Sequence, residues 1–288
     1  MGQIKIVSRK TLGKLNIAKL YLWSLYKCGK SKNLFNDVET FCLFIGHARS
    51  GHSLVGSLLD AHPNAVIAHE LDVLNFIQAG CSKNQIYYLL LENSQAFATA
   101  GRAWTGYSYQ VPNQWQGRFQ KLQIIGDKKG AGTTVKLRDK PELFQLLRKK
   151  TDTPIKFVHV VRNPYDNIST TAMRQGSDFD LERKIRSYFS LCDTVVNLKK
   201  QVPGSDILDL RHEELIADPK LCLSQLCHFL DLEVSNDYLD DCASIIFKTP
   251  HQSRHKIQWP LESLDLIKRK MNNYAFLEGY SFEDTDKR

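Results

Sequence analysis

Short runs of consecutive apolar residues recur along this chain of 288 residues, separated by stretches in which apolar positions have helical spacing. Runs of this length, rich in Val, Ile and Phe, are typical of buried parallel strands. Strands that alternate with helices predict crossover units on one parallel sheet. The four predicted strands cover residues 41–45, 65–68, 155–161 and 206–210, and residues 123–125 are a shorter fifth candidate.

The fold class follows from this alternation. No repeat, low-complexity tract or flexible linker interrupts the sequence, so we expect one domain over residues 1–288. We predict a three-layer α/β/α arrangement with a central parallel sheet. Residues 75–122 form an insertion in this scheme, helical at first and then aromatic. Its last part, 103–119, indicates a large loop or lid that either covers a binding pocket or is anchored on the core by its own aromatic residues.

A helical extension is expected at the N-terminus, over residues 1–38. The apolar stretch 15–26 is short and is broken by Lys19, so it fits neither a signal peptide nor a spanning helix. It is either an amphipathic helix of the kind that lies on a membrane surface or a surface helix packed on the domain, and surface helices usually have this pattern, which favours the second. Its apolar positions near helical spacing are Leu12, Leu15, Ala18, Leu22 and Leu25, and the basic residues before and within it include Lys5, Arg9, Lys10 and Lys14.

Composition narrows the function only a little. Lys and Arg outnumber Asp and Glu by 39 to 31, a net charge of +8 that suits an anionic ligand, a nucleic acid or a membrane surface equally well. The seven cysteines are scattered without a C-x-x-C pair, which argues against a disulfide framework or zinc ribbon and favours a reducing cytoplasm. We expect no metal, because His251 and His255 have the spacing of a zinc helix but lack its glutamate and a third ligand.

The strongest chemical signal is a glycine loop between the first strand and a helical stretch. Gly46 and Gly51 have the spacing of a P-loop-like phosphate-binding loop, in which backbone amides and a helix N-terminus hold a phosphate. His52 stands where a nucleotide kinase needs a lysine, so Mg-dependent phosphoryl transfer lacks its main cation. Arg49 supplies a permanent positive charge within the loop instead, which suits an anion bound without metal.

The run from Ile45 to Ser53, followed by Leu-Asp-Ala-His-Pro at 59–63, resembles the 5′-phosphosulfate loop of the sulfotransferase superfamily. The resemblance implies that 3′-phosphoadenosine 5′-phosphosulfate (PAPS) is the co-substrate, and 3′,5′-adenosine bisphosphate (PAP) the product. Ala48 replaces the proline of the family motif, and His52 with Ser53 replaces two threonines. The residues implied to hold the 5′ end are Arg49, Ser50, Gly51, His52 and Ser53.

Two later segments also resemble this superfamily. Arg162, at the end of a predicted strand, precedes the helix start Asn163-Pro164 and is followed eight residues later by Thr170. This run is similar to the 3′-phosphate motif, with Ser169 as the adjacent alternative to Thr170. The segment 210–215 resembles an Arg-Tyr-Glu-Asp-Leu motif of architectural role, and the basic run 248–256 resembles a nucleotide-closing loop, which makes Arg254 and Lys256 candidates.

Sulfuryl transfer requires a base for the attacking acceptor and a cation at the departing phosphate. Glu70 has the spacing from Arg49 of the catalytic glutamate in tyrosylprotein sulfotransferases, and it follows a predicted strand. His69 is a competing base. Lys128, after the short fifth strand candidate, resembles the lysine that polarises the leaving group, although Lys129 beside it leaves the choice open.

These patterns predict an enzyme that moves a sulfuryl group from PAPS to a hydroxyl or amine of a small-molecule acceptor. The lack of a spanning segment favours a cytoplasmic acceptor such as a secondary metabolite, and residues 75–122 are expected on the acceptor side. Stable membrane insertion and nucleic-acid binding are not expected. The alternatives are a P-loop kinase of nucleotides or small molecules, and a non-enzymatic basic module that binds nucleic acid or a membrane surface.

Overall fold

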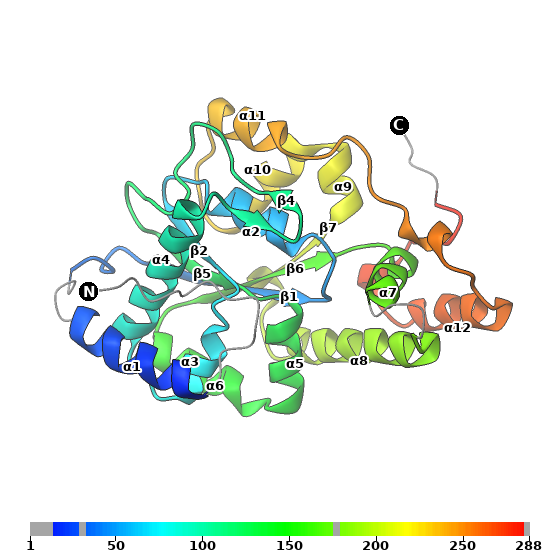
Figure 1. Cartoon of the computed structure of the whole chain (residues 1–288), viewed down its shortest axis with the longest axis horizontal. Helices are drawn as coiled ribbons and strands as arrows, with labels where there is room; N and C mark the ends of the chain where they lie inside the picture. Colours follow the sequence, from blue (N-terminus) through cyan, green and yellow to red (C-terminus); the bar gives the residue numbers. More distant parts are fainter. Residues whose placement is uncertain (1–13, 29–32, 175–178, 285–288) are drawn as a thin grey trace.

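A computed structural model describes residues 14–28, 33–174 and 179–284 of the chain. Five parallel strands form a central sheet in the order β2-β5-β1-β6-β7 (Figure 1). Helices cover both of its faces, which confirms the predicted three-layer α/β/α fold. All five predicted strands are present, with the bounds β1 Thr40–Gly46, β2 Ala65–His69, β5 Ile124–Lys128, β6 Ile155–Val161 and β7 Ile207–Arg211.

Strand β1 is the middle strand of the sheet. Every one of its residues is buried, as expected for a strand covered on both faces. Phe41, Leu43 and Ile45 point to one face, and Cys42 and Phe44 point to the other. The core of the molecule is therefore two apolar layers, one on each side of the sheet.

Each layer belongs to its own set of helices (Figure 1). The layer under Cys42 and Phe44 is formed with α2 His52–Leu59, α9 His212–Ala217, α10 Pro219–Phe229 and α11 Asn236–Ser244. The opposite layer is formed with α3 Val73–Gln78, α4 Lys83–Thr99, α5 Ala131–Asp139, α6 Glu142–Thr151, α7 Pro164–Met173, α8 Leu181–Lys199 and α12 Leu261–Met271. Three short 3-10 turns complete the fold, at Gly204–Asp206, Ser253–Lys256 and Ala275–Leu277.

Two helices, one from each layer, begin directly after a capping residue. The side chain of Asn163 accepts a hydrogen bond from the amide of Tyr165, and Pro164 occupies the first position of α7. Asp218 caps α10 in the same way through the amide of Leu221. Because the cap sets the first turn, Arg162 is fixed at the junction between β6 and α7.

A buried carboxylate holds the aromatic part of the insertion. Asp60 is fully buried and accepts hydrogen bonds from the hydroxyl of Ser94 on α4 and from the amide of Gly117. It also forms an ion pair with Arg102, which precedes a short hairpin. The hairpin consists of β3 Ala103–Trp104 and β4 Tyr107–Ser108. The stretch predicted as a loop thus contains a hairpin, anchored by Asp60 and not only by its own aromatic residues.

The N-terminal helix α1 Lys14–Cys28 packs on α4 and α3 (Figure 1), as predicted for a surface helix. The face that packs is not the predicted apolar stripe. Leu20 and Ser24 are buried, whereas Leu15, Leu22 and Leu25 are exposed to solvent. Leu12, Lys5, Arg9 and Lys10 lie outside the described residues.

No helix in the described ranges combines the length and the apolar character that crossing a membrane requires.

Gly126 lies where two neighbouring strands of the sheet approach each other closely. A Cβ atom at this position on β5 would overlap the carbonyl oxygen of Cys42 on the neighbouring strand. We expect Gly126→Ala to lower the free energy of unfolding by roughly 2–3 kcal/mol, because backbone atoms must shift to make room. Thermal and urea denaturation measure this change. Gly204→Ala is the matched control, since no atom lies within 4 Å of its added methyl group, and an equal effect of the two substitutions would contradict the packing argument.

Candidate functional site

The glycine loop runs from the end of β1 to the start of α2. Gly51 immediately precedes the helix with φ of 100°, and the ring of His212 packs against it so closely that a Cβ atom would collide with the ring. Arg49 also has a left-handed backbone, with φ of 70°, an unfavourable conformation for a residue with a side chain. The first amides of α2 point out of the helix at this loop, which makes them donors for an anion.

Neighbouring elements fix the loop from outside. The side-chain amide of Asn167 on α7 donates hydrogen bonds to the carbonyl of Ala48 and to the hydroxyl of Ser50, both at 2.9 Å. The amide of Gly46 donates to the hydroxyl of Thr134 on α5 at 2.7 Å. The loop is therefore held in shape without a ligand, as expected of a preformed phosphate site.

The predicted loop residues divide into two groups. Arg49, Gly51, His52 and Ser53 line a cavity of about 660 Å³. Ser50 is buried and turned toward α7, away from that cavity. The Nε2 atom of His52 donates to the carbonyl of Ile45 at 2.8 Å, and burial lowers the pKa of this imidazole to about 4. His52 is therefore neutral at physiological pH, and its ring closes the loop on itself instead of supplying a cation.

Glu70 and two lysines form the charged cluster at the edge of β2 and β5. The carboxylate of Glu70 is 3.1 Å from Nζ of Lys128 and 3.3 Å from Nζ of Lys129. Burial raises the pKa of Glu70, but the two ammonium groups lower it more, so it lies below the ordinary value. Lys128 is itself buried and also donates to the hydroxyl of Ser53 at 3.0 Å. The cluster thus links the edge of the sheet directly to the glycine loop.

Asp127 fixes the turn that carries Glu70. Glu70 has a left-handed backbone, with φ of 58°. The fully buried carboxylate of Asp127 accepts hydrogen bonds from the amides of the next residues, Leu71 at 3.1 Å and Val73 at 2.8 Å. Because Asp127 precedes Lys128 on β5, the end of this one strand positions both Glu70 and Lys128.

His69, the competing base, has different surroundings. Its ring stacks on Phe97 at 3.9 Å between ring centroids and meets Trp104 edge-on at 4.8 Å. Burial, followed by the charges of Lys128 and Arg102, keeps the pKa of His69 far below its ordinary value. His69 is not among the residues that line the cavity. His69, the last residue of β2, thus lies in the core of the insertion, whereas the left-handed turn that follows places Glu70 at the cavity.

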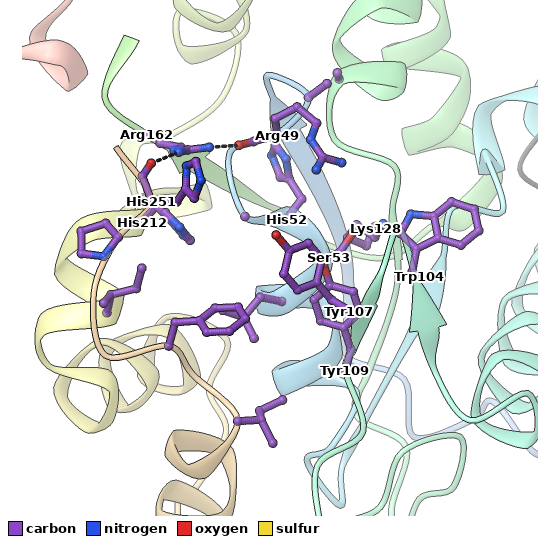
Figure 2. Close-up of a pocket in the computed structure, with 18 of the residues that line it drawn as sticks. Arg49, His52, Ser53, Trp104, Tyr107, Tyr109, Lys128, Arg162, His212 and His251 are labelled. Atoms are coloured by element: carbon purple, nitrogen blue, oxygen red, sulfur yellow. Dashed lines mark hydrogen bonds between the residues drawn. The ribbon is translucent and has the colours of Figure 1, made fainter. Parts of the chain in front are cut away.

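A second cationic region surrounds Arg162, on the other side of the loop (Figure 2). Its guanidinium donates to the carbonyls of Arg49, at 3.1 Å, and of His251. It also contacts the hydroxyl of Thr170 at 3.5 Å, so the two predicted partners do converge. The Nε atoms of Arg49 and Arg162 and Nδ1 of His212 are buried without a hydrogen-bond partner. Buried polar atoms without a partner at one place indicate a site that a polar ligand completes.

The remaining predicted residues lie around α7. Ser169 is fully buried and bonds to Ser253 and to the carbonyl of Asp166. Arg254 is buried and paired with Asp166 at 2.5 Å, so its charge is used inside the protein. Lys256 does line the cavity and lies 3.0 Å from Nε2 of His251. Lys256 therefore lines the same cavity as Arg162, whereas Thr170, Ser169 and Arg254 are not among its lining residues.

Several residues of the cavity wall are not among the site residues predicted from the sequence. Phe247 is one, and its ring meets that of Tyr107 edge-on at 5.7 Å, so the hairpin touches the 245–250 segment across the cavity. His212 is another, and its position directly after β7 is the signal that could have identified it. Figure 2 shows Trp104 beside Lys128, and His212 and His251 beside Arg162. The further lining residues include Leu54, Ile216, Ile245, Thr249 and Pro250.

The glycine loop and the buried cations lie at the carboxyl edge of the parallel sheet, where open α/β folds bind their ligands. Comparisons with known proteins add sequence and fold similarity to this geometry. Residues 154–236, which contain both the Arg162 motif and the segment after β7, match the model of the sulfotransferase family. A search of the curated proteins finds no sequence that matches the chain significantly.

Solved sulfotransferase structures share the fold at low sequence identity. The sulfotransferase domain of the olefin synthase from Synechococcus PCC 7002 is 16% identical with a TM-score of 0.50, and the match covers 81% of this chain and 94% of that one. The sulfotransferase domain of the curacin biosynthetic pathway is 16% identical with a TM-score of 0.51, over 82% and 96%. A sulfotransferase of Mycobacterium avium is 10% identical with a TM-score of 0.51, over 91% and 83%. Part of the chain, residues 154–236, is thus similar in sequence to the sulfotransferase family, and the whole described fold is similar to that of solved sulfotransferases.

Asp127 gives the site a testable pH dependence. Burial raises the pKa of this carboxyl from 3.8 to about 7, so the folded protein favours its neutral form. The stability that this group contributes is fully present below pH 4 and is lost as the pH rises to 7. We expect the wild type to lose roughly 2–3 kcal/mol more stability than Asp127→Asn between pH 5 and pH 8. Urea denaturation at the two pH values measures it. The exposed control Asp139→Asn should follow the wild type, and parallel curves for Asp127→Asn would refute the assignment.

Proposed function

We propose that this chain transfers a sulfuryl group from PAPS to a hydroxyl or amine of a small-molecule acceptor. The observation that carries the proposal is the charge of the cavity. Arg49, Lys128, Arg162 and Lys256 line it together, and Glu70 is the one carboxylate among the described lining residues. An anion with charge at two separate points complements such a wall, and PAPS carries a phosphosulfate at one end of its nucleoside and a 3′-phosphate at the other.

The nucleotide occupies the half of the cavity between the glycine loop and Arg162 in this proposal. Arg162 and Thr170 bind the 3′-phosphate, with Lys256 as the further cation of that half. The amides at the start of α2 and the side chains of Arg49 and Ser53 bind the phosphosulfate. The buried Nε atoms of Arg49 and Arg162, which lack partners in the protein, support this arrangement.

The chemical step needs few groups. As the acceptor oxygen or nitrogen attacks sulfur, the bond from sulfur to the bridging phosphate oxygen breaks, and Glu70 takes the proton of the acceptor. PAP leaves with the negative charge of the broken bond, and Lys128 stabilises that charge through its ammonium group. The contact of Lys128 with both Glu70 and Ser53 supports this role, because it joins the base to the phosphosulfate loop. Lys129, on the outer side of Glu70, keeps the carboxylate ionised.

The acceptor binds between Glu70 and the aromatic hairpin. Trp104 and Tyr107 line this part of the cavity and present flat apolar surfaces, which suit a small molecule with an apolar or aromatic body. In this proposal the acceptor wall is the hairpin part of the insertion 75–122, whose residues Trp104, Tyr107, Ser108 and Tyr109 line the cavity. Whether oxygen or nitrogen is sulfated depends on the acceptor, and secondary metabolites and a cytoplasmic location remain predictions of the sequence.

The affinity for nucleotides tests the proposal against a kinase. We expect calorimetry to show tighter binding of PAP than of ATP–Mg, because His52 cannot supply the cation that a β- or γ-phosphate requires. Arg162→Ala should weaken PAP binding about 10- to 100-fold through the loss of a charge-assisted contact. Arg186→Ala, at an exposed position of α8, is the control. Tighter binding of ATP–Mg, or no binding of either nucleotide, would reject the proposed function.

The role of Glu70 has its own test. Glu70→Gln keeps the shape of the side chain but cannot accept a proton, so we expect turnover with radiolabelled PAPS to fall about 100-fold or more. PAP affinity should stay close to that of the wild type, since the nucleotide contacts are made elsewhere. His69→Gln is the comparison at the competing position. Full turnover by Glu70→Gln, or a greater loss in the His69 variant, would reassign the base.

A further inference from the structure

The outer face of α1 carries apolar side chains that nothing in the described structure covers. Leu15, Leu22 and Leu25 are 71%, 66% and 46% exposed. With Ala18 they follow the three- and four-residue spacing of one helical stripe. Ten large hydrophobic residues are exposed in the described part of the chain, and five of them lie between residues 15 and 34. The apolar exposure of the molecule is therefore concentrated at this helix and just after it.

The positive charge of the protein is concentrated in the same region. Residues 1–36 contain eight Lys and Arg and no Asp or Glu. Because the whole chain has 39 basic and 31 acidic residues, residues 37–288 contain 31 of each and are neutral overall. The net charge of +8 therefore lies entirely in the first 36 residues. Within α1, the helical spacing places the exposed Lys19 beside the leucine stripe.

The inner face of α1 is fixed to the protein independently of these residues. Leu20 is buried, and Gln85 on α4 donates hydrogen bonds to the hydroxyl of Ser24 at 3.0 Å and to the carbonyl of Tyr21 at 3.2 Å. The ring of Trp23 packs on Tyr88 with 5.4 Å between their centroids. The leucine stripe is consequently presented by a helix that is already folded and docked.

We propose that the outer face of α1 binds the surface of an anionic phospholipid membrane. A helix with leucines in the centre and lysines at the sides lies in the membrane interface, where the leucines enter the acyl region and the ammonium groups meet the headgroup phosphates. The concentration of charge favours lipid over a second copy of the chain, because two copies of a basic face repel each other. It favours lipid over nucleic acid because three leucines stand where phosphate contacts would be made.

The arrangement of the molecule is compatible with such docking. Figure 1 shows α1 at the opposite end of the molecule from α7, which follows the carboxyl end of β6 and borders the cationic region around Arg162. The last turn of α6, on the same side as α1, adds Arg148, Lys149 and Lys150. Docking through α1 therefore leaves the cavity open to its ligands.

Vesicle flotation with the full chain tests this surface. We expect binding to phosphatidylcholine vesicles that contain phosphatidylserine, little binding to phosphatidylcholine alone, and a fall of about tenfold or more when high salt screens the charges. The double substitutions Leu15→Ser with Leu22→Ser, and Lys14→Glu with Lys19→Glu, should each reduce binding to the anionic vesicles by at least about tenfold. Leu261→Ser, at an exposed leucine on α12, should leave it unchanged.

Two further measurements keep the result unambiguous. The variants should retain the melting temperature and PAP affinity of the wild type, because the outer face of α1 contributes to neither the core nor the cavity. Equal binding to neutral vesicles, or unchanged binding by both double variants, would overturn the proposal. Failure of the wild type to bind anionic vesicles would also overturn it. A dimer in ultracentrifugation that the double substitution Leu15→Ser with Leu22→Ser dissociates would then assign the face to a second copy, and salt-sensitive DNA binding by the wild type would assign it to nucleic acid.

Discussion

The confinement of positive charge at one edge of the sheet is the constraint on which the architecture of the site depends. Arg49, Lys128 and Arg162 stand at the ends of three adjacent elements, and burial disfavours the charged form of each. Like charges held this close together repel unless opposite charge lies between them. Among the lining residues that the structure describes, Glu70 is the only carboxylate that provides it. The surrounding contacts, from Asn167 on the loop to Asp127 on the Glu70 turn, hold in place a group of cations that an anionic ligand stabilises.

The sequence was sufficient to predict this framework because the framework depends on local rules. Buried strands are continuous apolar runs, and Asn163 with Pro164 marks the start of a helix at any position in a fold. The glycine spacing of the loop is likewise a backbone requirement. These features were enough to predict the fold class, the glycine loop and the Arg162 region proposed to bind phosphate, and the edge of the sheet at which Glu70 lies.

Side-chain direction was harder to predict, because it is decided by residues distant in the sequence. Arg254 lies in a basic run that resembles a nucleotide-binding loop, but its guanidinium is paired with the carboxylate of Asp166, 88 residues earlier. Ser50 belongs to the loop motif, yet Asn167 draws its hydroxyl toward α7. The leucine spacing of α1 predicted the helix correctly but the wrong packed face, since Gln85 and Tyr88 on α4 select the face of Leu20 and Ser24. The part of the cavity wall formed by Phe247 and Tyr107 could not be predicted, because these residues lie in two distant segments that only the fold brings together.

The seven cysteines have a consequence for chemical labelling. Six are buried, and burial raises the pKa of the thiols of Cys42 and Cys227 to about 12 and of Cys81 and Cys222 to about 11, so these thiols are poorly reactive nucleophiles at neutral pH. Cys28, the last residue of α1, is the one thiol that is partly accessible. A maleimide fluorophore should therefore attach selectively there in the unaltered protein. The native chain thus carries its own attachment point for a spectroscopic reporter, next to the exposed leucines and remote from the cavity at the glycine loop.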